Sequence, residues 1–230
     1  MSKILLETIN LRKTYKHVNG NINLFNNLNI KIKKGDLVAL VGPSGSGKSS
    51  LLHLLALLDE PTKGDIKINN VFTRKFADEE KDEVRRKNIS IIFQDNNLLT
   101  DFTALENVIM PLIIKGEKNN VSIKKATKIL NEVKISNRTN HFPSELSGGE
   151  QQRVAIARAL IAETDLILAD EPTGNLDYKT SEDIFSYFLK LKKLNKAIIF
   201  ATHNRELANK VDYKLSIFKG NIKRVNARSV

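Results

Sequence analysis

The sequence predicts an α/β protein built around a mainly parallel sheet. Four short apolar runs, rich in β-branched residues, have the length of strands that are buried on both faces: Leu37–Val41, Ile89–Phe93, Leu166–Ala169 and Ala197–Ala201. Helical patterns lie between or after them, at Ser49–Leu58 and at Tyr178–Leu194, with Asp177 as the predicted N-cap of the second. Strands that alternate with helices predict a doubly wound sheet.

Two regions depart from this alternation. Residues 1–35 and 64–72 have the pattern of short polar strands with turns, which predicts an antiparallel sheet at one side. Residues 95–145 contain no convincing strand and are interpreted as a helical insertion. Within them we predict a helix that Ser122 caps, with an apolar side formed by Ile123, Ala126, Ile129, Leu130 and Val133.

Composition limits the classes of protein that need to be considered. The 230 residues suit one well-packed domain, or one domain with a small inserted subdomain. The absence of cysteine excludes disulfides and thiolate metal sites. The N-terminal residues lack the apolar core of a signal peptide, and the longest apolar stretches are too short to span a membrane. Lysines spread along the whole chain account for the net charge of +11, so we do not expect nucleic acid as a partner.

Polar residues follow each of the four predicted strands. Gly42 and a glycine-rich loop follow the first strand, and Gln94 follows the second. Asp170 and Glu171 follow the third strand, and His203 comes two residues after the fourth. Ligands of open α/β sheets bind beyond the carboxyl ends of the strands. These four separated signals therefore predict one binding site at one edge of the sheet.

The segment after the first strand matches the P-loop pattern, between a predicted strand and a predicted helix. Glycines let the backbone wrap closely around phosphates, so that its N–H groups and the helix N-terminus face the anion. We expect Lys48 to reach the β- and γ-phosphates of ATP, and the Ser49 hydroxyl to bind Mg²⁺. A loop that only caps a helix is the structural alternative. The predicted ATP-binding residues here are Gly42, Pro43, Ser44, Gly45, Ser46, Gly47, Lys48, Ser49 and Ser50.

The acidic pair after the third strand suits phosphate hydrolysis. A buried carboxylate at a strand end is costly unless a cation pairs with it. For Asp170 that cation is Mg²⁺, bound directly or through water. Glu171 comes next and points elsewhere, and we predict that it is the general base for the water that attacks the γ-phosphate. The alternative is a solvated Asp-Glu turn.

A second helix start, at Leu146–Gln151, also suits an anion and opens a helical pattern over Gln151–Ile161. The spacing of Ser147 and Glu150 is that of a capping box, which is a purely structural alternative. The glycines at 148 and 149 do not suit that alternative, because glycine costs up to about 1 kcal/mol relative to alanine within a helix. Two phosphate-binding helix starts and one nucleotide core predict that this segment binds ATP held by a second copy. Its predicted contacts are Ser147, Gly148, Gly149 and Glu150.

Together, the P-loop, the Leu-Ser-Gly-Gly-Glu-Gln segment, the Asp-Glu strand end and the following His resemble the ABC ATPase family over essentially the whole chain. The resemblance implies a P-loop domain with a RecA-like core, an antiparallel β-subdomain and an inserted helical subdomain. We place the β-subdomain and core at residues 1–94 and 150–230, and the helical subdomain with the signature segment at 95–149. It also implies that two ATP molecules are held head-to-tail between two domains, each by one P-loop and the opposing signature segment.

The resemblance assigns further roles. Tyr15 would stack on the adenine, although an aromatic residue that merely packs on the edge sheet is the alternative. Gln94 would contact Mg²⁺ and the attacking water and link the site to a transmembrane partner, and His203 would hydrogen-bond the γ-phosphate. Residues 174–177 would contact the other subunit, and Asp177 could equally be only a helix cap. Asn204 stands where the family often has Asp, which we expect to alter the local hydrogen bonding without removing the phosphate contact.

Within that family, two stretches resemble the ATP-binding subunits of lipoprotein-releasing systems: residues 98–108 and 140–145. Residues 168–177 are shared with a wider group, which includes macrolide exporters and the FtsE-type cell-division complex. The resemblance implies a homodimer on the cytoplasmic side of the bacterial inner membrane, bound to two transmembrane permease subunits, whose ATP hydrolysis drives lipoproteins towards the outer membrane. A macrolide or peptide exporter, a division complex and a nucleic-acid-associated ATPase are the alternatives.

Overall fold

The computed structural model describes residues 3–18, 20–174 and 176–227, and it contains the predicted parallel sheet. The order of the strands is β11–β10–β4–β9–β8–β7, with every pair parallel except β10 and β11. The four predicted strands are confirmed, to within one residue at their ends, as β4 (Leu37–Val41), β7 (Ile89–Ile92), β8 (Leu166–Asp170) and β9 (Ala197–Ala201). Two further strands, β10 (Tyr213–Phe218) and β11 (Asn221–Asn226), extend the sheet beyond β4 and were not predicted from the sequence.

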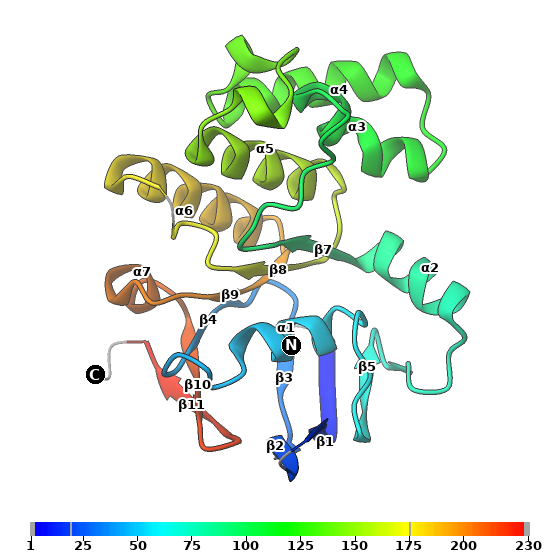
Figure 1. Cartoon of the computed structure of the whole chain (residues 1–230), viewed down its shortest axis with the longest axis vertical. Coiled ribbons are helices and arrows are strands. Elements are labelled where there is room, and N and C mark those ends of the chain that lie inside the picture. Colours follow the sequence, from blue (N-terminus) through cyan, green and yellow to red (C-terminus); the bar gives the residue numbers. More distant parts are fainter. Residues whose placement is uncertain (1–2, 19, 175, 228–230) are drawn as a thin grey trace.

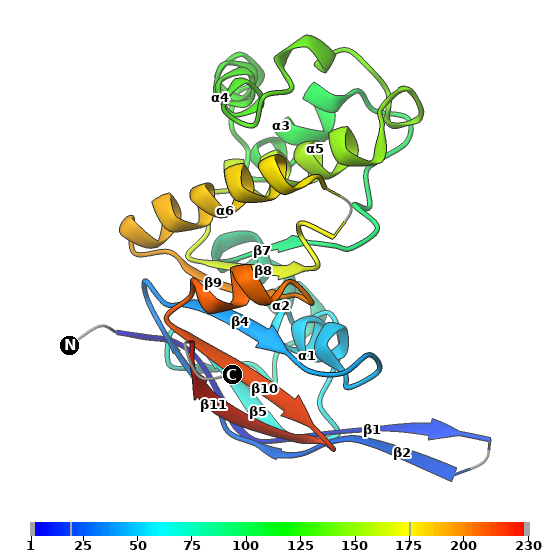
Figure 2. The ribbon, with the colours of Figure 1, turned by 90° about the vertical axis from the view of Figure 1, so that its left-hand side faces the viewer.

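The predicted antiparallel sheet is also confirmed. It is formed by β1 (Ile4–His17), β2 (Gly20–Leu28), β3 (Lys31–Lys33), β5 (Lys63–Ile68) and β6 (Val71–Phe72), all paired antiparallel. The outer part of the β1–β2 hairpin extends beyond the rest of the molecule (Figure 2). Its strands are therefore paired with each other alone from Lys13 onwards.

Helix α1 (Lys48–Leu55) is packed between the two sheets. Its side chains Leu51, Leu54 and Leu55 are fully buried in a core that also contains Leu6 of β1 and Leu40 of β4. The helix is shorter than predicted, because Leu57 adopts a left-handed backbone conformation (φ 58°) and ends the run. One apolar core therefore fixes the P-loop helix against both sheets.

The opposite face of the parallel sheet is covered by α5 (Gly148–Ile161), α6 (Tyr178–Lys193) and α7 (Arg205–Asn209). Helix α6 contributes Phe185 and Phe188, whose rings lie 6.1 and 5.9 Å from the ring of Phe200 in β9. The predicted cap is confirmed, since Asp177 Oδ1 accepts the N–H of Thr180 at 2.9 Å.

A third core holds the helical insertion together beyond the β7 edge of the sheet (Figure 1). It brings α3 (Ala104–Ile114) and α4 (Asn119–Glu132) against α5, and residues 95–145 contain helices and turns but no strand. Two short 3₁₀ turns, Ser136–Arg138 and Pro143–Glu145, lead into α5. Helix α5 crosses the boundary that we predicted between residues 149 and 150, so the subdomain boundaries stay a prediction.

Two local predictions need correction. Ser122 does not cap α4, because that helix begins at Asn119 after Lys118. Ser122 lies inside the helix, fully buried, and its hydroxyl donates to the carbonyl of Lys118 at 3.1 Å, a bond that serine readily makes one turn back. Helix α5 begins at Gly148 rather than Gln151, so the two glycines form its first turn.

Helix α2 (Asp78–Asn88) joins the antiparallel sheet to β7 and buries none of its side chains. Its acidic first turn and basic last turn suit the helix dipole. Among the described residues, no helix has the length and apolar character that a membrane span requires.

Candidate nucleotide-binding site

The predicted P-loop connects β4 to α1 and folds around Lys48. The side chain of Lys48 is largely buried, and its ammonium donates hydrogen bonds to the carbonyls of Gly42 and Pro43 at 3.1 and 3.2 Å. The hydroxyl of Ser46 is buried without a hydrogen-bond partner in the described part of the chain. An orphaned hydroxyl in such a loop suits a phosphate oxygen, because a buried polar group normally has a partner.

Gly47 shows why this loop cannot take a larger residue. It caps α1 in a left-handed conformation (φ 93°), which favours glycine. An added Cβ atom would lie 2.8 Å from the ring of Phe25 and 2.9 Å from Leu24, both in β2. The antiparallel sheet therefore shapes the loop, in addition to any demand made by phosphate.

At the end of β8, Asp170 is buried and Glu171 turns away from it. The peptide N–H of Glu171 donates to the carbonyl of Ala201 in β9 at 3.1 Å, and its backbone has the uncommon positive φ of 46°. The carboxylate is directed towards His203: Oε2 accepts the peptide N–H of His203 at 3.3 Å. The other oxygen, Oε1, is buried and lies 3.5 Å from Nε2 of His203, without a hydrogen-bond partner among the residues described.

Electrostatics at this carboxylate favour proton uptake. Burial raises the pKa of Glu171 above its ordinary value, although the peptide N–H of His203 opposes the shift. The negative charge of Asp170 acts in the same direction as burial, and the positive charge of Lys48 acts against it. A buried carboxylate with one unpartnered oxygen and a raised pKa has the properties of a general base.

The loop after β9 presents His203 to solvent, with a side chain that is 59% exposed. Asn204 caps α7, because its Oδ1 accepts the N–H of Leu207 at 3.1 Å. The side chain of Asn204, which stands where the family often has Asp, therefore makes a local hydrogen bond to the helix that it caps. His203 keeps its position beside Glu171.

Gln94 lies in an exposed turn after β7, and an arginine that the sequence analysis missed holds the residues that follow it. The guanidinium of Arg158 in α5 donates to the carbonyls of Asn96 and Asn97, both at 2.7 Å. Those two residues adopt positive φ angles of 59° and 45°. Burial lowers the pKa of the Arg158 guanidinium, and an arginine within the apolar stretch Ile156–Ile161 was the signal that could have revealed it.

The signature segment forms the capping box that its spacing predicted. Ser147 Oγ accepts the N–H of Glu150 at 3.3 Å, and Glu150 Oε2 accepts the N–H of Ser147 at 2.8 Å. The N–H of Ser147, together with the guanidinium of Arg138 at 3.0 Å, lowers the pKa of Glu150 to about 2. None of the hydrogen bonds or ion pairs made by residues 147–150 reaches the P-loop of the same chain, within the residues described.

The two glycines of this segment differ in what surrounds them. A Cβ atom on Gly149 would lie 3.3 Å from a methyl group of Leu176. A Cβ atom on Gly148 would meet nothing within 4 Å, and Gly148 has no positive φ. The described chain therefore does not itself require glycine at position 148.

The remaining predicted residues are placed around the P-loop helix and after β8. The hydroxyl of Tyr15 in β1 donates to Oδ2 of Asp59 at 2.8 Å, and Ser50 in the first turn of α1 lies close enough to affect the pKa of Tyr15. The N–H of Gly174 donates to the carbonyl of Glu171 at 3.0 Å. Asn175 lies outside the described residues. The structure thus groups the P-loop, Asp170, Glu171 and His203, and keeps the signature segment apart from them.

Comparison with known proteins identifies the family to which this arrangement belongs. Residues 25–174 match the family described as ABC transporter. The chain belongs to the ABC transporter family. The family resemblance inferred from the motifs is therefore confirmed, and the described fold is that of an ABC ATPase.

Curated ABC relatives cover nearly the whole chain. The lipoprotein-releasing system ATP-binding protein LolD of Rickettsia bellii is 47% identical over 219 residues, which cover 94% of this chain and 96% of the relative. LolD of Legionella pneumophila (strain Lens) is 41% identical over 223 residues, covering 96% and 98%. A solved dimeric ABC cassette, MJ0796 bound to ADP and Pi in a post-hydrolysis state, superimposes with a TM-score of 0.94 at 38% identity, covering 98% of this chain and 100% of that one.

Proposed function

We propose that the protein is the ATP-hydrolysing subunit of an ABC transporter that releases lipoproteins from the bacterial inner membrane towards the outer membrane. The near full-length identity of 41–47% to LolD proteins supports this substrate class. The motif residues stand at the strand ends where the chemistry needs them.

In this proposal the P-loop, residues 42–49, binds the phosphates of ATP with its backbone, and Lys48 contacts the β- and γ-phosphates. The orphaned hydroxyl of Ser46 supports an anion at this loop. Ser49, Gln94 and Asp170 supply the hydroxyl, amide and carboxylate oxygens that Mg²⁺ prefers. When bound, Mg²⁺ neutralises charge between the β- and γ-phosphates.

Hydrolysis is assigned to the residues beside Lys48. Glu171 takes a proton from water while the water oxygen bonds to the γ-phosphorus and the bond from that phosphorus to ADP breaks. His203 donates a hydrogen bond to the γ-phosphate and keeps Glu171 oriented through its own peptide N–H. The raised pKa and the unpartnered oxygen of Glu171 support this division of roles.

The observation that carries the ATP-bound dimer in this proposal is the open space around Gly148. Glycine in the first turn of a helix costs less than about 1 kcal/mol relative to alanine. Nothing in the described chain explains why glycine stands at position 148. A phosphate approaching from a second copy explains it, because bare backbone lets the anion reach the helix N-terminus. The protein is therefore a homodimer in which Ser147–Glu150 of each copy binds ATP held by the other, as the dimeric form of the solved ABC cassette supports.

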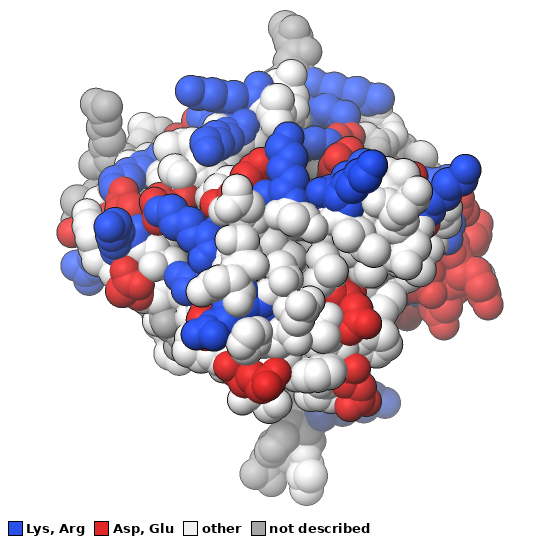
Figure 3. Space-filling view, turned by 90° about the horizontal axis from the view of Figure 1, so that it is seen from above, with Lys and Arg blue, Asp and Glu red and all other residues white. Residues whose placement is uncertain are grey.

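The partners in this proposal are two transmembrane permease subunits, which the protein serves from the cytoplasmic side of the inner membrane. The turn that carries Gln94 is exposed and lies beside the helical insertion, which suits contact with a permease. Nucleic acid is not a proposed partner. On the end of the molecule shown in Figure 3, Lys and Arg are interspersed with Asp and Glu and border an uncharged area, rather than forming one basic patch.

The test combines ATP binding with partner capture. Lys48→Ala is expected to weaken ATP binding by about 10- to 100-fold, because a charge-assisted hydrogen bond to phosphate is lost. Lys193→Ala, which removes an exposed lysine on α6, is the matched control and should bind ATP normally. The tagged protein is also expected to bring two permease subunits and lipoprotein out of its own membranes. Co-purification of a drug exporter or of division proteins instead would contradict lipoprotein release as the function.

A further inference from the structure

Tyr15 is held at its hydroxyl end, although it lies near the exposed end of β1. Its Oη donates to Oδ2 of Asp59 at 2.8 Å. The side chain of Ser50, in the helix that begins at the P-loop, lies close enough to lower the pKa of Tyr15 against the stronger effect of burial. The residue is 38% exposed, so it is open to a ligand while the hydrogen bond to Asp59 fixes its orientation.

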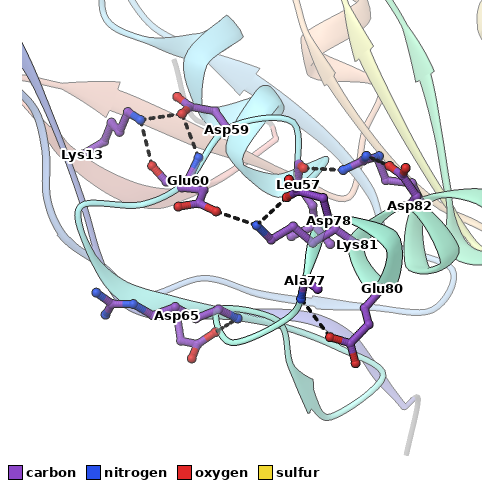
Figure 4. Close-up of polar contacts among 12 residues, drawn as sticks. Lys13, Leu57, Asp59, Glu60, Asp65, Ala77, Asp78, Glu80, Lys81 and Asp82 are labelled. Atoms are coloured by element: carbon purple, nitrogen blue, oxygen red, sulfur yellow. Dashed lines mark hydrogen bonds and ion pairs between the residues drawn. The ribbon is translucent and has the colours of Figure 1, made fainter.

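Lys13 holds the same carboxylate and covers the ring of Tyr15. The two side chains lie on the same side of β1, because they are two residues apart on a strand. Lys13 is 8% exposed, and its ammonium lies 2.5 Å from Oδ1 of Asp59 and donates to the carbonyl of Glu60 at 2.8 Å (Figure 4). The same ammonium lies 4.7 Å from the centroid of the Tyr15 ring, which is a cation–π contact.

The segment that carries Asp59 is itself anchored to α2. Lys81 contacts the carboxylate of Glu60 at 2.5 Å (Figure 4). Arg85 donates to the carbonyl of Leu57 at 2.6 Å. Asp59 is therefore a fixed acceptor placed between Lys13 and Tyr15, rather than a mobile surface carboxylate.

We propose that Asp59 is a positioning residue for the nucleotide base: it fixes the Tyr15 ring with Lys13 against one face, so that the adenine of ATP stacks on the other face. The inference rests on the proposed function and deepens it, because the family resemblance implies only that Tyr15 stacks on the base and assigns no role to Asp59. Asp59 touches neither the base nor the phosphates and acts through Tyr15.

Fixing the ring in advance favours binding for a physical reason. A free tyrosine loses rotamer freedom when a base stacks on it, and a tyrosine that is already held does not bear that cost again. The charge states suit the arrangement. Burial, together with the hydrogen bond to Asp59, raises the pKa of Tyr15, so the phenol stays a donor. Burial opposes ionisation of Asp59, but the hydrogen bonds from Lys13 and Tyr15 hold its pKa below the ordinary value.

The experiment compares two ligands and a matched pair of variants of the full chain. Calorimetry measures the affinity for ATP and for inorganic tripolyphosphate, which carries the phosphates without a base. Asp59→Ala is expected to weaken ATP binding by about tenfold, within the range that a base–aromatic stack contributes, and to leave tripolyphosphate binding unchanged. Glu79→Ala is the control, because it removes an exposed carboxylate in the first turn of α2 for which the described residues show no contact with Lys13, Asp59 or Tyr15. It should bind both ligands as the unaltered protein does.

A second variant keeps the inference testable if Asp59→Ala does not fold. Tyr15→Phe keeps the ring and removes the hydroxyl that Asp59 holds, and it should weaken ATP binding by about threefold without affecting tripolyphosphate. Unchanged ATP affinity in the folded variants would overturn the role of Asp59 and leave the proposed function intact. Equal weakening of both ligands by Asp59→Ala would also overturn it, since the phosphate loop would then be what had changed. If the unaltered chain binds neither ligand, the proposed function itself fails.

Discussion

The carboxylate of Glu171 is bound to His203 through the backbone rather than the ring: Oε2 accepts the peptide N–H at 3.3 Å, while Oε1 lies 3.5 Å from Nε2 and has no hydrogen-bond partner among the described residues. One oxygen is thus used to orient the group, and the other is left for a ligand. The imidazole of His203 stays largely exposed and can turn to a second group.

Glu171→Gln is expected to abolish ATP turnover while ATP remains bound, because the amide cannot take the proton of the attacking water. The loss should be at least about 100-fold in kcat, the lower end of what a general base contributes. Trapped ATP should hold two copies together. Steady-state hydrolysis and light scattering with ATP measure both effects, and a monomer with normal turnover would contradict the assignment.

The thermal stability of Glu171→Gln and its dependence on pH serve as a control for its activity. A raised folded pKa means that the fold favours the protonated acid, so this stabilisation is complete below the ordinary glutamate pKa and is lost as pH rises through the folded value. The neutral amide does not lose it. Thermal unfolding of Glu171→Gln at neutral pH should therefore occur at or above the temperature of the unaltered protein, and the difference should shrink as the pH falls. A destabilised variant would make its inactivity uninformative.

The rate of hydrolysis is expected to fall on the acid side at a higher pH than an ordinary glutamate would give. Burial raises the pKa of Glu171, and a base must be deprotonated to act, so activity disappears as the pH falls through that raised value. Profiles of kcat/KM, which report the groups of the free enzyme, measure the midpoint between about pH 4 and pH 8. A midpoint at or below the ordinary glutamate pKa of 4.5 would exclude Glu171 as the group that titrates.

Ser147→Arg should leave ATP binding to the single chain intact and stop both dimer formation and hydrolysis. The exposed arginine would occupy the space that a second copy's phosphate needs. Ser147→Thr keeps a capping hydroxyl and should behave nearly as the unaltered protein does. Dimerisation is measured in the Glu171→Gln background with ATP. Loss of ATP binding by the single Ser147→Arg chain would mean that the signature segment belongs to its own chain's site.

Glu150→Gln is expected to lower stability at neutral pH by about 0.5 kcal/mol more than Glu106→Gln does, because it removes the ion pair with Arg138 in addition to a charge near a helix N-terminus. The pKa of Glu150 is lowered to about 2, so its stabilisation is complete above the ordinary value of 4.5 and is lost as the pH falls towards 2. The difference between the proteins should disappear over that interval in urea unfolding. Glu106→Gln is the matched control, because Glu106 has the same place in the capping box of α3 without an arginine partner. An equal effect of both variants would assign no stabilisation to Arg138.

The sequence predicted those parts of the fold whose apolar pattern is strong. The four buried strands are continuous apolar runs, and α6 has one apolar face, so their burial could be anticipated. Helix α2 could not be found in this way, because it buries no side chain and is held by charges and by Arg85. Large apolar residues alternate with polar ones at the start of Tyr213–Phe218, a pattern that predicts a strand, so β10 could have been predicted from the sequence.

The residues of the candidate site also fall into those that the sequence pattern predicts and those that it does not. Residues at strand ends could be predicted to converge, since the carboxyl ends of neighbouring parallel strands share an edge. The partners of Asp59 and Arg158 could not be predicted, because they lie 44 to 62 residues away in sequence and only the packed fold brings them together. The roles of the predicted site residues stay predictions that the variants above test.

The two hydrogen bonds donated by the Arg158 guanidinium join helix α5 to the turn after β7. The N-terminus of the helix faces outward at Ser147, and about 16 Å further along, at a rise of about 1.5 Å per residue, the guanidinium holds the two carbonyls that follow Gln94 by two and three residues. Because the helix is held at Arg158, a tilt at its N-terminus would also move the turn that Arg158 binds. In the proposed assembly, this one helix therefore connects the segment that would bind the ATP of a second copy with the turn proposed to contact a permease.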